Sequence, residues 1–224
     1  MMSPQALIEL IDISFSYKGR PPVLKGVNLT VNEGERVALV GYNGSGKTTA
    51  LSVIMGLIKP SSGTVKIFGK ERVTEKDFSE VRPLMGFVFQ DSDDQLFCPT
   101  VEDDIAFGPL NMGLSQEEAS KVAREVMEKL DIVEFGPRVT HDLSGGEKRL
   151  VALGTALALK PRMLILDEPT TYLDKLVSVR LLSILNELQL PFLVVSHDLE
   201  FLQKTNCRYL EMRSGVVRDS DGVF

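Results

Sequence analysis

One short segment constrains the fold more than any other, because Gly41-Tyr-Asn-Gly-Ser-Gly-Lys47-Thr48 matches the pattern G-x-x-x-x-G-K-[ST]. The apolar run Val37-Ala-Leu-Val comes directly before it and is typical of a buried strand. After the loop, apolar residues recur at helical spacing as far as Pro60: Leu51, Ile54, Met55 and Ile58. A glycine-rich turn can by itself start a helix. The strand in front and the Lys-Thr pair instead predict a strand, a phosphate-binding loop and a helix in that order.

The loop carries groups of the kind that bind phosphate. Its glycines let the backbone wrap closely, so that N–H groups and the helix N-terminus point at phosphate oxygens. We expect Lys47 to reach the β- and γ-phosphates and Thr48 to hold Mg²⁺. The residues predicted to bind the nucleotide here are Gly41, Tyr42, Asn43, Gly44, Ser45, Gly46, Lys47, Thr48 and Thr49.

Buried-strand runs recur at residues 86–89, 163–166 and 192–195, separated by stretches with helical spacing. The predicted fold class is therefore α/β: a P-loop NTPase core with a mainly parallel sheet. Residues 8–17 and 27–31 alternate more strongly and predict an antiparallel β flank. In this prediction one domain spans residues 1–224. Its α/β core is formed by residues 1–90 and 161–224, and residues 91–160 are an inserted α-helical subdomain.

Composition excludes several classes of function. The formal net charge is −6 and no long Lys/Arg run occurs, so nucleic acid is not an expected partner. The longest apolar run, near residues 150–159, is much shorter than the roughly 20 residues that cross a bilayer. Residues 1–10 do not resemble a signal peptide. Cys98 and Cys207 lack metal-ligand spacing, which favours reduced thiols in a cytosolic chain.

Two acids, Asp167 and Glu168, directly follow the apolar strand of residues 163–166. Strand ends of this kind lie at the carboxyl edge of a sheet, where open α/β folds bind ligands. The pattern predicts a metal-binding role for Asp167 and a water-activating role for Glu168. Solvated acids at an ordinary strand end are the alternative, which the nearby phosphate loop makes less attractive.

The segment Leu143-Ser-Gly-Gly-Glu147 fits a capping box from Ser144 to Glu147 at the start of a helix. Its two glycines at a helix N-terminus also leave N–H groups for an anion, which would be a second phosphate site. Two such sites in one chain suggest a site shared between subunits. A second capping box, residues 115–118, begins an amphipathic helix that we expect to serve packing and solubility.

These motifs together resemble an ABC-transporter ATPase. The resemblance rests on the loop at 41–48, Gln90, residues 143–147, Asp167-Glu168, residues 173–174 and His197, and it covers nearly the whole chain. It implies that ATP, bound with Mg²⁺, is hydrolysed to ADP and phosphate. Tyr172 is bulkier than the small residue usual at its position in the family.

The resemblance also assigns roles. Tyr17 would stack on adenine, Gln90 would contact Mg²⁺ and the attacking water, Glu168 would be the general base and His197 would hold the γ-phosphate. Lys47 belongs to the same catalytic set, and the implied Mg²⁺ contacts are Thr48, Gln90 and Asp167. Taken singly, Tyr17 could be a half-buried strand aromatic and His197 could cap a turn or helix.

Family ATPases work as head-to-tail dimers, so the resemblance implies a second ABC ATPase subunit as partner. Ser144, Gly145, Gly146 and Glu147 of one subunit would close over ATP held by the loop of the other. Homodimer and heterodimer both remain open. One chain alone is expected to be a poor enzyme.

The stretch from Gln90-Asp-Ser-Asp-Asp-Gln-Leu-Phe97 to Asn111 is similar to the energy-coupling-factor and cobalt/nickel importer subgroup. This implies integral-membrane transport subunits as partners, a peripheral location at the cytoplasmic face of the cell membrane, and a transition-metal ion (cobalt or nickel) or a vitamin as cargo. Many members of that subgroup continue past the end of this chain with an extension that helps hold the dimer together.

Other interpretations of the same stretch are weaker or stay open. A calcium loop is one alternative, because Asp91, Asp93, Gln95 and Glu102 fall at EF-hand positions, but it would need glycine where Leu96 stands. Leu96, Phe97 and Phe107 are expected either to form a docking surface for the membrane partner or to belong to the subdomain core. A soluble ABC ATPase acting on nucleic acid or ribosomes would need a coiled-coil insert, a second cassette or a basic surface, and none is visible.

Overall fold

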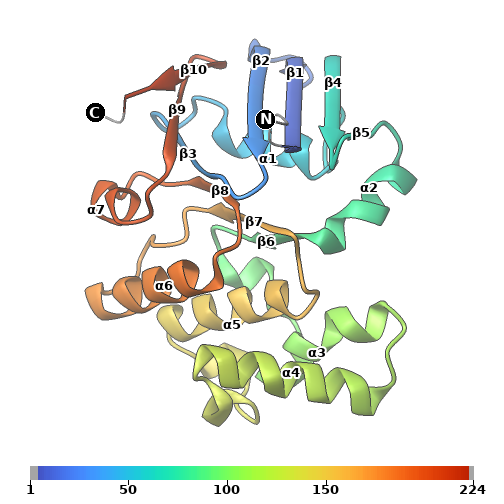
Figure 1. Cartoon of the computed structure of the whole chain (residues 1–224), viewed down its shortest axis with the longest axis vertical. Helices are drawn as coiled ribbons and strands as arrows, with labels where there is room; N and C mark the ends of the chain where they lie inside the picture. The colour runs from blue at the N-terminus through green and yellow to red at the C-terminus, as the bar shows by residue number, and fades with distance from the viewer. Residues whose placement is uncertain (1–4, 222–224) are drawn as a thin grey trace. The chain divides into compact units, whose positions relative to one another are not determined.

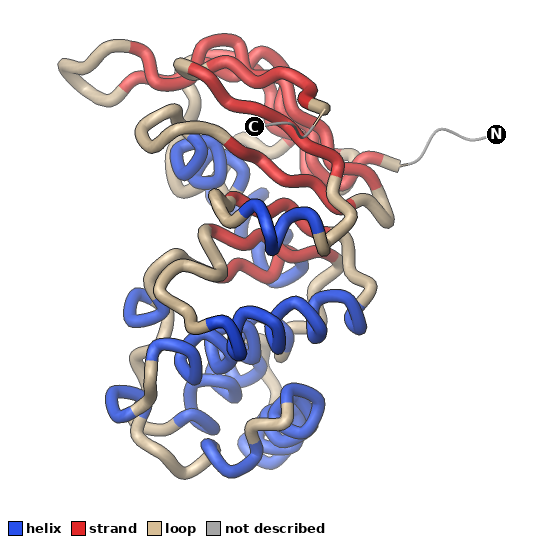
Figure 2. Tube along the Cα trace, turned by 90° about the vertical axis from the view of Figure 1, so that its left-hand side faces the viewer, coloured by secondary structure: helices blue, strands red, loops and turns tan. Residues whose placement is uncertain are grey.

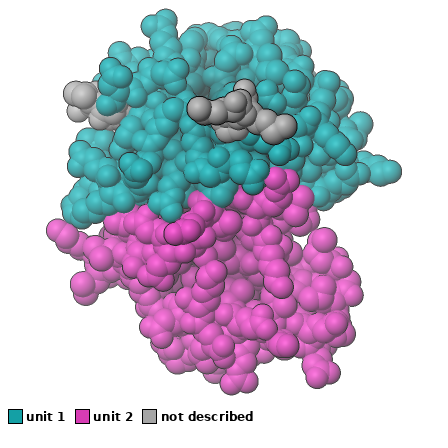
Figure 3. Space-filling model, in the orientation of Figure 1, with its two compact units in different colours: residues 1–82, 191–224 teal, residues 83–190 magenta. Residues whose placement is uncertain are grey.

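The computed structural model describes residues 5–221. The chain divides into two compact units, one formed by residues 1–82 and 191–224 and the other by residues 83–190, coloured separately in Figure 3. The predicted helical subdomain, residues 91–160, lies wholly within the second unit. This unit also contains two strands, residues 85–88 and 163–167, and a further helix, residues 175–188. The helix over residues 145–157 packs on the first of these strands.

The first unit contains an antiparallel sheet with the strand order β2-β1-β4-β5 (Figure 1). Its strands are β1 (Ala6–Ser16), β2 (Pro22–Asn32), β4 (Ser62–Ile67) and β5 (Lys70–Glu71). Ile8, Ile13 and Val27 are fully buried, as expected for strands with one face on a core. The predicted antiparallel flank is confirmed, and β4 and β5 extend it.

The same unit places β3 (Arg36–Val40) between β8 (Phe192–Val195) and β9 (Arg208–Arg213), parallel to both. Leu39 is paired with Val195 in this register, so β3 and β8 end at the same edge of the sheet. The strand β10 (Val216–Ser220) adds an antiparallel edge next to β9. The helices of this unit are α1 (Lys47–Ile54), α2 (Glu75–Val81) and α7 (Leu199–Gln203).

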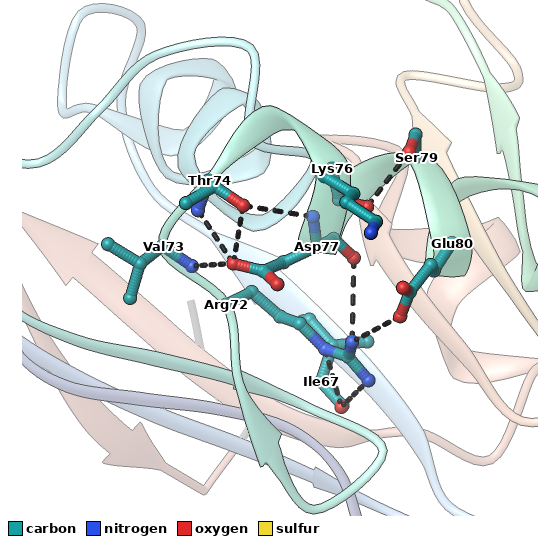
Figure 4. A network of polar contacts seen from close by, with 8 residues as sticks. All are labelled: Ile67, Arg72, Val73, Thr74, Lys76, Asp77, Ser79 and Glu80. Atoms are coloured by element: carbon teal, nitrogen blue, oxygen red, sulfur yellow. Dashed lines mark hydrogen bonds and ion pairs between the residues drawn. The ribbon is translucent and has the colours of Figure 1, made fainter.

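A polar network fixes α2 beside the β4–β5 hairpin (Figure 4). Thr74 caps the helix through a capping box with Asp77. The buried guanidinium of Arg72 donates to the carbonyl oxygen of Ile67 at 3.4 Å and to the carboxylate of Glu80 at 3.3 Å. These contacts tie the helix to the hairpin, which explains its position at this end of the antiparallel sheet.

The second unit is mainly helical (Figure 2). Its two strands, β6 (Met85–Val88) and β7 (Met163–Asp167), are parallel, with Val88 paired to Leu166. Its helices are α3 (Val101–Asn111), α4 (Gln116–Leu130), α5 (Gly145–Leu157) and α6 (Lys175–Leu188). Short 3₁₀ turns occupy Ser92–Asp94, Val133–Phe135 and Thr140–Asp142, and another, Arg82–Leu84, precedes β6.

The helix α5 is central to this unit, because it packs on β6, α3 and α4. Gly86 permits a close approach at β6, where an added Cβ would lie 2.8 Å from a methyl of Leu164. The predicted capping box at Ser115 begins α4, whose inner face buries Ala119, Ala123, Met127 and Leu130. Over the described residues 5–221, no helix has the length and apolar character needed to span a membrane.

Candidate nucleotide site

The phosphate loop, residues 41–48, joins the end of β3 to the start of α1. Gly41, Gly44 and Gly46 adopt positive φ values of 146°, 77° and 113°. At Gly41 an added Cβ would lie 2.2 Å from the carbonyl oxygen of Met212 on β9. The carbonyl of Ser45 also accepts the N–H of Gly215 at 3.1 Å. The loop therefore rests on the β9–β10 hairpin at a distance that only glycine allows.

The side chain of Lys47 folds back over the loop. Its Nζ donates to the carbonyl oxygens of Gly41 at 2.7 Å and Tyr42 at 3.1 Å, and the residue is only 7% exposed. A positive charge is thus held above the backbone of the loop, at the N-terminus of α1, where a helix favours an anion.

The loop fits a phosphate ligand on the evidence of its own atoms. Gly46 is the N-cap residue of α1 and provides no side chain to cap the helix, which leaves the first-turn N–H groups for a ligand. The Ser45 hydroxyl is buried and has no hydrogen-bond partner within the described part of the chain. Thr48 is exposed at the start of α1, where its hydroxyl is available to a metal ion.

Tyr17 lies beside the first turn of α1. Its hydroxyl is 3.4 Å from Oγ1 of the buried Thr49, and its ring contacts Phe15 edge-on with centroids 4.9 Å apart. The residue remains 41% exposed. The structure therefore brings Tyr17 and Thr49 together next to the phosphate loop, with part of the aromatic ring open to a flat ligand. Tyr42 and Asn43 are exposed on the loop itself.

His197 follows β8 at the same sheet edge as the phosphate loop, since β3 and β8 are parallel neighbours in register. His197 is exposed, whereas Ser196 is buried and accepts the N–H of Asp198 at 3.0 Å. Asp198 is the residue that caps α7, through the N–H of Phe201. Asp198, and not His197, therefore caps the helix, so the capping role considered for His197 from the sequence does not apply.

In the second unit, Gln90, Asp167 and Glu168 lie at the carboxyl ends of β6 and β7; we call this the β6–β7 edge. Asp167 and Glu168 are only 3% and 7% exposed, so they are not the solvated acids of an ordinary strand end. Glu168 has φ of 47°, in the left-handed region that costs energy for a residue with a side chain. A costly backbone at a buried carboxylate is typical of a functional site.

Residues 143–147 form the predicted capping box at the start of α5. The N–H of Glu147 donates to Ser144 Oγ at 3.3 Å, and Glu147 Oε2 accepts the N–H of Ser144 at 2.7 Å. A hydrogen bond from Arg138, at 2.6 Å, lowers the pKa of Glu147 and keeps it ionised. Ser144 and Gly145 are exposed, which leaves this helix N-terminus accessible to an anion.

The residues after the β6–β7 edge lead into α6. Tyr172 is 96% exposed with φ of 64°, and Asp174 caps α6 by accepting the N–H of Val177 at 2.9 Å. At Gly146 an added Cβ would lie 2.8 Å from a methyl of Val177, so α6 approaches the start of α5 closely.

The Gln90 segment is held by Arg149, which no sequence motif singled out, and by Gln95, which the sequence offered only as a calcium-loop position. Arg149 on α5 is 3% exposed and donates to the carbonyl oxygens of Phe89 and Gln90. Burial lowers the pKa of Arg149, and the carboxylates of Asp91 and Asp167 partly offset that effect. The sequence offered one sign that Arg149 has a structural role, because it is a charged residue next to Leu150 and Val151 in an apolar helix.

The three residues considered for docking differ in their exposure to solvent. Leu96 is buried, at 3% exposure, and belongs to the core. Phe97 and Phe107 are 62% and 41% exposed, with their rings edge-to-face at 4.8 Å. The amide of Gln95 is hydrogen-bonded to Ala152 and Thr155, and this contact occupies one of the positions considered for a calcium loop.

Comparison with known proteins identifies the family. A model described as ABC transporter matches residues 24–171. The chain belongs to the ABC transporter family. It is an ATP-binding subunit with the P-loop NTPase fold, and it binds ATP with Mg²⁺ and hydrolyses ATP.

Individual relatives are similar over most of their length. The energy-coupling factor transporter ATP-binding protein EcfA of Methanothermobacter thermautotrophicus is 42% identical over 93% of this chain and 68% of its own. The structure of CbiO1 from Clostridium perfringens, part of the ABC transporter complex CbiONQ, has a TM-score of 0.87 at 32% identity, covering 96% of this chain and 87% of CbiO1.

A second solved structure shows a dimeric assembly. The ATP-binding cassette MJ0796, in a post-hydrolysis state bound to ADP and phosphate, has a TM-score of 0.87 at 28% identity, covering 97% of this chain and 99% of that cassette. A subunit of a transporter complex and a dimeric cassette are therefore both among the proteins to which this chain is similar.

Proposed function

We propose that this chain is the energy-coupling ATPase of a membrane importer whose cargo is a transition-metal ion, cobalt or nickel, or a vitamin. The observation that carries the proposal is the segment from Gln90 to Asn111, which is similar to that subgroup and presents the exposed Phe97–Phe107 pair. The likeness to EcfA and CbiO1 supports it. Cargo recognition belongs to a different polypeptide.

For hydrolysis, the two units have different tasks in this proposed function. In the first unit the phosphate loop binds the β- and γ-phosphates, Tyr17 stacks on adenine and His197 contacts the γ-phosphate. In the second unit Glu168 removes a proton from the attacking water, which Gln90 orients. Thr48, Gln90 and Asp167 would hold Mg²⁺, which supplies positive charge to the phosphate oxygens when bound.

The proposed active form is a head-to-tail dimer with a second ABC ATPase subunit. Ser144, Gly145, Gly146 and Glu147 of one subunit would contact the ATP held by the phosphate loop of the other. The exposed helix N-terminus at Ser144 supports this role, because the capping box uses the N–H groups of Ser144 and Glu147 and leaves those of Gly145 and Gly146 for phosphate oxygens. Closure of the dimer around ATP would then move the membrane subunits.

The proposed membrane contact is at the cytoplasmic face, where the Phe97–Phe107 pair would receive a helix from an integral-membrane subunit. Exposed aromatic rings in contact with each other provide apolar area of the kind that protein interfaces use. Leu96 is buried and belongs to the core, so it is not part of this proposed surface.

Recovery from membranes tests this proposal. We expect Phe97→Asp to lower co-purification with an integral-membrane protein by about tenfold, since a buried charge opposes an apolar interface. The readout is quantitative mass spectrometry of the complexes purified with the tagged chain. Val139→Asp is the matched control, because Val139 is also exposed, at 45%, in the same unit.

Membrane recovery that is equal for Phe97→Asp and Val139→Asp would contradict the docking role. Recovery of the chain with ribosomes or DNA and without an integral-membrane protein would overturn the importer proposal as a whole.

A further inference from the structure

The segment that follows β6 is held by an arginine from α5. The guanidinium of Arg149 donates to the carbonyl oxygen of Phe89 and, at 2.7 Å, to that of Gln90. Because Arg149 is 97% shielded from solvent, these two bonds replace lost hydration of a full charge and are strong ones. The rigid fork of an arginine is suited to two carbonyls at once, and a lysine cannot reproduce it.

A glutamine from the segment itself makes the return contact. Gln95 Oε1 accepts the N–H of Phe89 at 3.1 Å, and its Nε2 donates to the carbonyl oxygen of Ala152 at 2.8 Å and to Thr155 Oγ1 at 2.7 Å. Gln95 therefore connects the end of β6 with the middle of α5. Arg149 and Gln95 together are referred to below as the clamp.

The clamp joins two motifs that are separate in the sequence. One side of the clamp is α5, which begins with the Ser144–Glu147 capping box. The other side is the segment after β6, which contains Gln90. An α-helix hydrogen-bonded along its length moves as a rigid rod. A displacement of Ser144 and Gly145 is therefore carried by α5 to the backbone of Gln90.

We propose that Arg149 and Gln95 are positioning residues that make Gln90 and residues 144–147 move as one body. This inference rests on the proposed function for the roles of Gln90 and residues 144–147. In a head-to-tail dimer those motifs serve different ATP molecules. The clamp then transmits the engagement of one ATP by residues 144–147 to the Gln90 that orients water at the other ATP, and hydrolysis at the two sites becomes cooperative.

Two isosteric substitutions weaken the hydrogen bonds of the clamp without leaving a cavity. In Gln95→Glu, a carboxylate oxygen replaces the Nε2 donor and faces the carbonyl of Ala152. In Thr155→Val, a methyl replaces the hydroxyl that accepts from Gln95. Asp93→Asn is the matched control, because it removes an ion pair to Lys148 between the same segment and the same helix. Asp93 is 60% exposed at its side chain, where such a pair contributes little.

The experiment measures steady-state hydrolysis against ATP concentration for the full chain in its complex, together with ATP affinity and melting temperature. For both clamp variants we expect kcat to fall by about tenfold and the Hill coefficient to fall toward unity, while the Kd for ATP stays within about twofold. Asp93→Asn should keep both kinetic parameters. Hydrogen exchange at the Phe89 amide should accelerate in Gln95→Glu, because repulsion between the new carboxylate and the carbonyl of Ala152 moves the side chain that accepts that N–H.

Clamp variants that match Asp93→Asn in both kcat and Hill coefficient would overturn the inference while leaving the proposed function intact. So would a loss of activity that simply follows a loss of melting temperature, because a purely structural role predicts that outcome. An unmodified complex that hydrolyses ATP without cooperativity would also overturn the coupling. Absence of any membrane partner would instead refute the proposed function.

Discussion

The phosphate loop and the β6–β7 edge achieve their geometry in different ways. The loop is built from neighbouring residues, which are glycines with positive φ and a lysine that bonds back to Gly41 and Tyr42, and it rests on the β9–β10 hairpin. Gln90, at the β6–β7 edge, is held by Arg149, a side chain from a helix distant in sequence. The first site can be recognised from a run of neighbours, whereas the second is assembled by the tertiary fold.

The same difference separates binding from turnover. The loop holds groups that bind phosphate in both the ground state and the transition state, so damage to it should lower affinity. The β6–β7 edge holds the carboxylates and the amide proposed to act on water and metal, so damage there should lower the rate at saturating ATP. Substitutions in each region separate these effects.

The largest effect is expected from Glu168→Gln. The amide has the shape of the carboxylate and cannot accept the proton from water, so kcat should fall by about a thousandfold while ATP is retained in a stable dimer. Steady-state hydrolysis and size-exclusion chromatography with and without ATP provide the measurement. Glu187→Gln, an exposed acid at the end of α6, is the control. Hydrolysis at the unmodified rate would show that Glu168 is not the base.

A smaller loss, in binding, is expected from Gly41→Ala. The new Cβ would lie 2.2 Å from the carbonyl oxygen of Met212, so the loop must shift and the Kd for ATP should rise by about a hundredfold. Titration with a fluorescent nucleotide measures it. Gly34→Ala is the control, since φ there is 72° and an added Cβ meets nothing within 4 Å. An unchanged Kd in Gly41→Ala would show that the close approach to β9 does not shape the loop.

The smallest effect compares two capping boxes. Ser115 and Ser144 each accept the N–H of a glutamate at 3.3 Å, so Ser→Ala at either should lower the free energy of unfolding by about 1 kcal/mol. Only Ser144→Ala should also weaken ATP-dependent dimerisation, because only Ser144 is assigned a contact with nucleotide. Denaturant unfolding and light scattering give the two readouts. Equal dimerisation of both variants would remove Ser144 from the proposed interface.

Much of the local structure could be predicted from the sequence, because local patterns specify it. Residues 192–195 were expected as a strand and are β8, and the capping boxes begin α4 and α5 as predicted. The α/β fold with an antiparallel flank is confirmed. The strands β4 and β5 and the helix α2 were not predicted; Thr74 and Asp77 form a capping box that signals the start of α2.

The support of the β6–β7 edge could not be predicted, because its partners are far apart in sequence. Gln95 appeared as a candidate calcium ligand, and only the packing of α5 on β6 brings its amide to Ala152 and Thr155. Leu96 and Phe97 are neighbours in a strongly polar stretch, and the fold alone decides that one is buried and the other exposed. The chemical roles assigned to the site residues remain predictions.

The contact of the phosphate loop with the β9–β10 hairpin has a consequence for protein synthesis. Gly41 lies against Met212, and Ser45 accepts a bond from Gly215. A ribosome makes residues 41–48 early, yet the hairpin on which they rest emerges only after nearly all of the chain described here. The loop therefore reaches its nucleotide-binding geometry only after the hairpin has been made. A chain interrupted before Met212 should contain the complete motif and still fail to hold ATP.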